Sequence, residues 1–187
     1  MKKLLTKFFL DQALRNGLAN ADITKHFHSP SFCGVFSSDE EYRFKHAIKS
    51  KQKNMAWQDG EFISCILNLS KKNTQGSHFV CLIVYPNQKM VYYLDPTGLP
   101  PFQFFIEKLL YHTLELNCVL YNYVRFQKLG SNLCAYYCMY FILLYQAVKD
   151  GKTELIDQLK PYSENTEQNK QDQILVKNLR ILLNNKQ

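Results

Sequence analysis

Four residues that together could catalyse acyl transfer occur in the order His78, Asp95, Gln127 and Cys134. A cysteine thiolate is a strong nucleophile, and an imidazole beside it can take and return the proton that the reaction moves. A carboxylate next to the imidazole fixes its tautomer and stabilises the imidazolium. An amide N–H₂ group can donate a hydrogen bond to the oxyanion of a tetrahedral intermediate. These residue types predict hydrolysis of a peptide bond, provided that the fold brings them together.

Cys134 stands at the start of a long apolar segment. The pattern predicts a helix from Leu133 to about Val148, preceded by a turn and N-cap at 130–132. Unpaired backbone N–H groups and the positive end of the helix dipole favour a thiolate at such a position. The same N–H groups can bind an oxyanion. Taken alone, a cysteine in an apolar helix is more often a packing residue, so the prediction depends on its partners.

His78 and Asp95 flank a predicted β-hairpin. Strands are expected at Phe79–Tyr85 and Met90–Leu94, joined by a turn at 86–89. Antiparallel pairing about a turn centred near residue 87 would place His78 and Asp95 side by side. Polar pairs at the mouth of a hairpin are also common surface features, and a glutamine such as Gln127 means little by itself. The ordered set of four is more specific than any one member.

Together these residues resemble the adenovirus-type cysteine proteases, the viral branch of a group that includes the SUMO- and ubiquitin-like-protein proteases. The matching segments keep the order of that family and lie at 32–36, 76–79, 92–98 and 127–134. The chain departs from the family pattern at three positions. Phe79 stands where tryptophan is usual, Ala135 replaces the glycine after the nucleophile, and Asp95 stands where adenoviral members often carry glutamate.

The resemblance implies an α+β fold of the adenain type, related to papain-like proteases. A mixed sheet is expected to pack against a buried central helix that carries the nucleophile Cys134 at its N-terminus. His78 is then the general base, Asp95 orients the imidazole, and Gln127 helps to bind the oxyanion. The order of predicted elements independently suggests an α+β class. The implied activity is that of an endopeptidase that cleaves viral capsid and core precursor proteins during particle maturation, without a metal or organic cofactor.

Two other functions stay open. One is removal of SUMO or ubiquitin-like proteins by the same chemistry, and the other is a catalytically silent virion binding protein with the same fold. The resemblance places the protein in the virion or in the cytoplasm or nucleus of a host cell. Six scattered cysteines without C-x-x-C spacing also indicate a reducing compartment.

Relatives of the adenovirus type are stimulated by a disulfide-linked peptide and by DNA. The resemblance implies Cys118 as the cysteine that would bind the peptide. The formal net charge is +7, and a basic cluster at Lys45, Lys49, Lys51 and Lys53 could contact DNA or another acidic polymer. The same lysines could equally form an ordinary solvated surface.

The length of 187 residues predicts one domain over 1–187, and a monomer is expected. The apolar segment Leu133–Tyr145 is shorter than the roughly 20 residues that span a bilayer, so no membrane segment is expected. The N-terminus has no cleavage-site pattern of a secretory signal. The remaining expected elements are helices at Lys3–Leu18, Phe102–Leu116 and Gln173–Leu183, and strands at Phe62–Leu69 and Cys118–Phe126.

Overall fold

The computed structural model describes residues 23–24, 27, 29–54, 60–71, 78–101, 108–109, 111, 114–151, 170, 172–173 and 175. The elements follow one another as β1 (Phe32–Ser37), α3 (Glu41–Asn54), β2 (Ile63–Asn68), β3 (Phe79–Tyr85), β4 (Met90–Leu94), β5 (Cys118–Tyr121) and α5 (Cys134–Lys149). The helix predicted at Lys3–Leu18 lies outside the described residues, as do most of those at Phe102–Leu116 and Gln173–Leu183.

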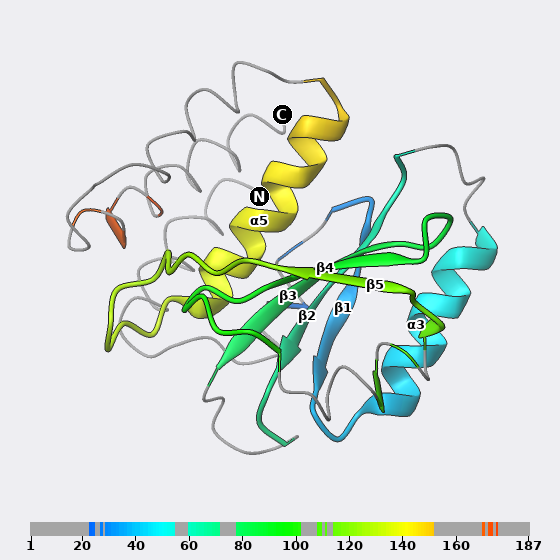
Figure 1. Ribbon diagram of the computed structural model, residues 1–187, viewed down its shortest axis with the longest axis horizontal. Coiled ribbons are helices and arrows are strands. Elements are labelled where there is room, and N and C mark those ends of the chain that lie inside the picture. Colours follow the sequence, from blue (N-terminus) through cyan, green and yellow to red (C-terminus); the bar gives the residue numbers. More distant parts are fainter. Residues whose placement is uncertain are drawn as a thin grey trace, which may run out of the picture.

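The five strands form one mixed sheet in the order β1-β2-β3-β4-β5 (Figure 1). The outer pairs β1/β2 and β4/β5 are parallel, and the two central pairs are antiparallel. The predicted α+β class with a mixed sheet is confirmed. The predicted bounds of β3 and β4 are also confirmed, because a short turn between two runs of β-branched and aromatic residues is a strong local signal.

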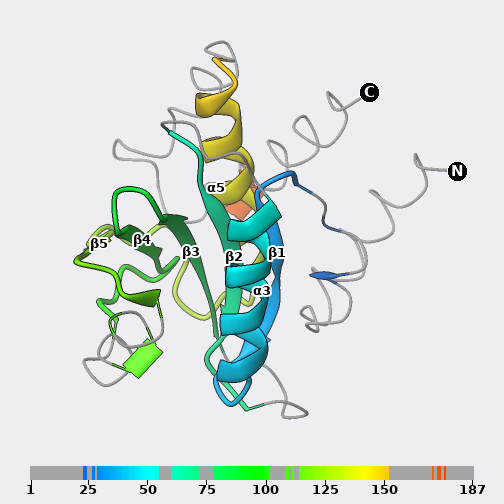
Figure 2. The ribbon, with the colours of Figure 1, turned by 90° about the vertical axis from the view of Figure 1, so that its right-hand side faces the viewer.

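Each face of the sheet is covered by one of the two long helices. Alternate side chains of β2 and β3, among them Ile66 and Ile83, pack with α5 in one apolar cluster. Their neighbours, among them Leu67 and Leu82, pack with Phe44 and Ile48 of α3 in a second cluster. In Figure 2, α3 lies along β1 and β2. Burial on both faces explains why β2 and β3 are apolar at nearly every position.

Helix α5 contributes an uninterrupted buried run from Cys134 to Leu143. Each large apolar side chain buried in this way stabilises the fold by about 1.5–3 kcal/mol relative to exposure. The start of the helix is thereby fixed against the sheet, which matters because Cys134 is its first residue. No helix in the described part of the chain is both long and apolar enough to cross a bilayer.

Strand β5 is shorter than predicted. The strand expected at Cys118–Phe126 ends at Tyr121, whose partner in β4 is Tyr93. The parallel ladder cannot continue much further, because β4 ends at Leu94 and the chain then turns at Pro96. The segment after Tyr121 is therefore available to form loops around the candidate site.

Candidate active site

His78 and Asp95 are in direct contact. The Nε2 atom of His78 lies 2.8 Å from Oδ1 of Asp95. The carboxylate is 2 % exposed and the imidazole 21 % exposed, so the pair is largely screened from water while one edge of the ring stays accessible. This contact was predicted, but the pairing is off by two residues. Cys81 pairs with Leu94, so Asp95 continues opposite Val80, and the His78 side chain reaches it diagonally.

The carboxylate of Asp95 is held by its own turn. Its Oδ1 atom accepts hydrogen bonds from the backbone N–H of Thr97 at 2.7 Å and from the Thr97 hydroxyl at 2.6 Å. Asn122 clamps the backbone of Asp95 from the end of β5: its Oδ1 accepts from the Asp95 N–H at 2.7 Å, and its Nδ2 donates to the Asp95 carbonyl at 2.6 Å. The orientation of the acid is thus fixed from two sides.

Helix α5 begins at Cys134, one residue later than predicted, and its N-cap is not the expected one. The cap residue is Leu133, and it makes no side-chain cap hydrogen bond. The hydroxyl of Ser131 instead accepts a hydrogen bond from the Leu133 N–H at 3.3 Å. The N–H groups of Tyr136 and Tyr137 bond to the Leu133 carbonyl, so the N–H of Cys134 lies at the uncapped helix tip. Such a tip provides donors and a positive partial charge for an anion.

The imidazole of His78 links the acid to the sulfur. Burial alone would lower the pKa of His78, but hydrogen bonds to Asp95 and Cys134 and the charges of both groups raise it to about 9. Because Nε2 faces Asp95, Nδ1 is the nitrogen left for the sulfur. At neutral pH His78 is therefore an imidazolium, the state that supports a neighbouring thiolate and can give a proton to a leaving group.

Gln127 is buried, with 4 % exposure, between the two segments that hold the acid and the cysteine. Its backbone N–H bonds to the Pro96 carbonyl at 2.9 Å, and its Nε2 donates to the Ser131 carbonyl. Within the described part of the chain its Oε1 atom has no hydrogen-bond partner, an unusual condition for a buried amide oxygen. The amide nitrogen carries two hydrogens, so Nε2 can donate a second hydrogen bond in addition to the one to Ser131.

Gly98 lets the turn after Asp95 lie directly on the loop that leads to Gln127. Its N–H bonds to the Asp95 carbonyl at 2.9 Å, and its φ is +74°. A Cβ atom at this position would lie 2.8 Å from the Val124 carbonyl carbon and 2.9 Å from the Arg125 nitrogen. Only glycine fits this approach without moving backbone. The acid and the buried amide therefore sit on two loops in van der Waals contact.

We expect Gly98→Ala to lower the free energy of unfolding by about 2–4 kcal/mol. Alanine is strained in the left-handed backbone conformation, and its Cβ atom would be too close to the backbone of the neighbouring loop. The matched control is Gly130→Ala, at a φ of +78° with open space around it, which should cost only about 1–2 kcal/mol. Urea denaturation of both variants measures the difference. Equal losses would show that the close approach at Gly98 does not constrain the chain.

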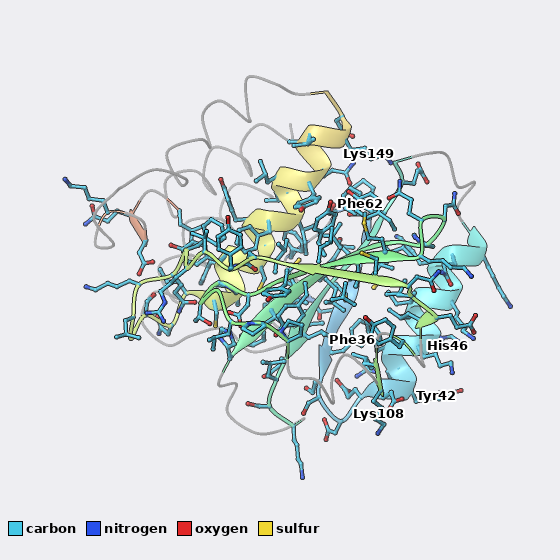
Figure 3. The ribbon with its side chains drawn as sticks, in the orientation of Figure 1. Phe36, Tyr42, His46, Phe62, Lys108 and Lys149 are labelled. Carbon is cyan, nitrogen blue, oxygen red and sulfur yellow. The ribbon has the colours of Figure 1, made fainter. Side chains whose placement is uncertain are left out.

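The residues predicted for activators lie elsewhere. Cys118 is exposed at the start of β5, on the edge of the sheet. The four lysines are all in α3, where helical spacing puts Lys45, Lys49 and Lys53 on one side and Lys51 about 120° away from Lys45. Figure 3 shows Tyr42 and His46 on this helix, where their rings stack 6.4 Å apart. Binding of a peptide at Cys118 or of DNA at α3 stays a prediction.

Sequence reasoning missed Thr97 and Asn122. Thr97 follows Asp95 by two residues, the spacing at which an aspartate side chain accepts a hydrogen bond from the backbone, and this signal could have been used. Asn122 lay inside a stretch predicted to be strand, and its contact with Asp95 depends on the parallel pairing of β4 with β5. The described residues contain no group of three or more His, Cys, Asp or Glu that could hold a metal ion.

No protein-family model matches the sequence, and no curated protein is detectably similar to it. Among solved structures, the chain is similar to the SUMO protease Ulp1 with its catalytic cysteine oxidised to a sulfinic acid. The TM-score is 0.40 at 13% identity, over 96% of this chain and 77% of that one. A likeness of this size does not define the function, which has to be inferred from the side chains of the site.

Proposed function

We propose that this chain is a cysteine endopeptidase with Cys134 as its nucleophile. The observation that carries the proposal is that His78 lies 2.8 Å from the buried carboxylate of Asp95 and close enough to Cys134, at the tip of α5, for that cysteine to raise the pKa of its imidazole. A buried cysteine that serves only packing gains nothing from a charged histidine beside it. A histidine with no catalytic role gains nothing from a carboxylate that Thr97 and Asn122 hold in place. The arrangement supports nucleophilic catalysis.

In the proposed reaction, the Cys134 thiolate attacks the carbonyl carbon of the scissile peptide bond. The backbone N–H of Cys134 and the second N–H of the Gln127 amide donate to the oxyanion that forms. The C–N bond then breaks, and the His78 imidazolium gives its proton to the leaving amine. Water attacks the thioester after losing a proton to His78, and cleavage of the C–S bond releases the acid and restores the thiolate.

Viral structural precursor proteins are the proposed substrates, and particle maturation is the proposed role. The support is the resemblance of the segments around His78, Asp95 and Cys134 to adenovirus-type proteases. A deconjugating protease of the SUMO type would use the same chemistry, and a silent virion protein would keep the fold without it. These alternatives differ in what they cleave, so they can be separated by substrate.

The test is incubation of the purified chain with a peptide library made by digesting a cell lysate, with and without iodoacetamide. An endopeptidase should generate new internal cleavages that disappear after alkylation. SUMO and ubiquitin conjugates are incubated in parallel, and rapid cleavage of these with an intact peptide library would instead favour the deconjugating protease. No cleavage of either substrate, together with no preferential alkylation of Cys134, would contradict the proposal and favour the silent protein.

A further inference from the structure

Two loops beside the candidate site expose an unusual amount of apolar surface. Leu99 is 54 %, Tyr123 86 %, Val124 45 % and Leu129 75 % exposed. Single exposed apolar residues are common on proteins, but a group of them on neighbouring loops indicates a binding surface. We call this group, together with Arg125 and Lys128, the rim.

The rim is tied to the candidate catalytic residues. Leu99 follows Gly98, which touches the backbone of Val124 and Arg125. Leu129 lies in the turn between Lys128 and Ser131, where the Ser131 N–H bonds to the Lys128 carbonyl at 3.1 Å. That turn is joined to the site by the hydrogen bond from Gln127 to the Ser131 carbonyl. The loop from β5 to α5, yellow-green in Figure 1, thus carries most of the rim to the end of α5 at which Cys134 lies.

The charge of the rim has one sign. Arg125 and Lys128 are exposed, and the sequence contains no Asp or Glu from 96 to 106 or from 116 to 149. The carboxylate of Asp95, which directly precedes the first of these segments, is buried and paired with His78. Neither segment therefore supplies an acidic side chain that could neutralise these two exposed cations. Arg125 and Lys128 produce a positive potential beside the apolar side chains.

We propose that the rim binds the substrate segment next to the scissile bond and selects segments in which apolar residues are accompanied by Asp or Glu. The proposal rests on the proposed protease function and adds a substrate class to it. An extended peptide can place apolar side chains against Tyr123, Val124 and Leu129 while its carboxylates meet Arg125 and Lys128. Most residues of the rim are apolar, and the loop that carries them leads to Cys134. Both features favour a polypeptide as the ligand over a nucleic acid, because the phosphates of a nucleic acid would contact only the two cations.

The first test compares the wild-type chain with the double variant Arg125→Glu/Lys128→Glu on a peptide library made from a cell lysate. Wild-type cleavage sites should be enriched in Asp and Glu within a few residues of the cut, and the variant should prefer Lys and Arg there. For one acidic peptide chosen from the wild-type products, kcat/KM should fall about 10-fold in the variant, and by less at about 0.5 M salt, where charges are screened.

The control is Lys89→Glu/Lys149→Glu, which makes the same change of net charge at two exposed positions outside the rim and should leave the cleavage preference unchanged. A third variant, Tyr123→Ser/Leu129→Ser, should raise KM for the same peptide with little change in kcat or in the rate of alkylation of Cys134 by iodoacetamide. Wild-type cleavage without acidic enrichment, or an enrichment that survives the charge reversal, would overturn the inference while leaving the protease intact. Absence of all cleavage and of selective alkylation would instead show that the proposed protease function fails.

Discussion

Cys134→Ala is expected to abolish peptide cleavage and selective alkylation together. Loss of the nucleophile from a cysteine or serine protease site removes about 10⁴-fold or more of the rate, because the remaining groups have no covalent intermediate to stabilise. The substitution removes one sulfur from a side chain that is 7 % exposed, so the fold should survive. Cleavage of a peptide product identified from the library, and mass-spectrometric mapping of the alkylated cysteine, give the two readouts.

Cys138→Ala is the matched control, one turn further along α5. Cys138 is fully buried, and burial raises the pKa of its thiol, as do the neighbouring Cys81, Cys134 and Asp95. It is therefore a protonated packing residue that no reagent should reach, and its removal should keep most of the activity. Both experiments are best done in a Cys118→Ser background, since Cys118 is exposed and would take up reagent. Equal loss of activity in the Cys134 and Cys138 variants would remove the assignment of the nucleophile.

The elements that carry the candidate nucleophile and base were predictable because their signals are local. Phe79–Tyr85 and Met90–Leu94 are short, β-branched and aromatic, and the chain between them is a turn. The helix from Cys134 has an apolar run long enough to identify it and a polar turn before it. The positions of His78, Asp95 and Cys134 at the ends of these elements follow directly, whereas the register that sets the contact of His78 with Asp95 differs by two residues from the predicted one.

Strand β1 and helix α3 were not predicted from the sequence. Strand β1 has Gly34 at a φ of +138° and an irregular register between Phe32 and Val35, so it lacks the regular alternation of a strand. Helix α3 is strongly charged and buries only Phe44 and Ile48 completely, so its apolar stripe is narrow. In the sequence its lysines indicate a possible binding cluster. The contact of Phe44 with Phe36, which places the helix on the sheet, joins residues of two different elements and has no local sequence pattern.

Asp95→Asn is expected to lower kcat by about 10³–10⁴-fold, as does the same change in a Ser-His-Asp triad. Asparagine can keep the oxygen that accepts from Thr97 and His78, but it loses the negative charge. That charge and its hydrogen bond are causes that raise the pKa of His78 to about 9 against the effect of burial. The variant should therefore have a His78 of lower pKa, and less imidazolium at neutral pH to support the thiolate and to protonate the leaving amine.

The pH dependence separates this electrostatic effect from a structural one. In the wild type, the rate should be lost as the pH rises through about 9, where His78 gives up its proton. In Asp95→Asn the same loss should begin at lower pH.

Thr97→Val keeps the carboxylate and removes only the hydroxyl that donates to it, so it should cost less than about 10-fold, the worth of one hydrogen bond. If Asp95→Asn costs no more than Thr97→Val, or if its alkaline limit stays near that of the wild type, the carboxylate does not govern the protonation of His78. The proposed mechanism would then need another source for the imidazolium.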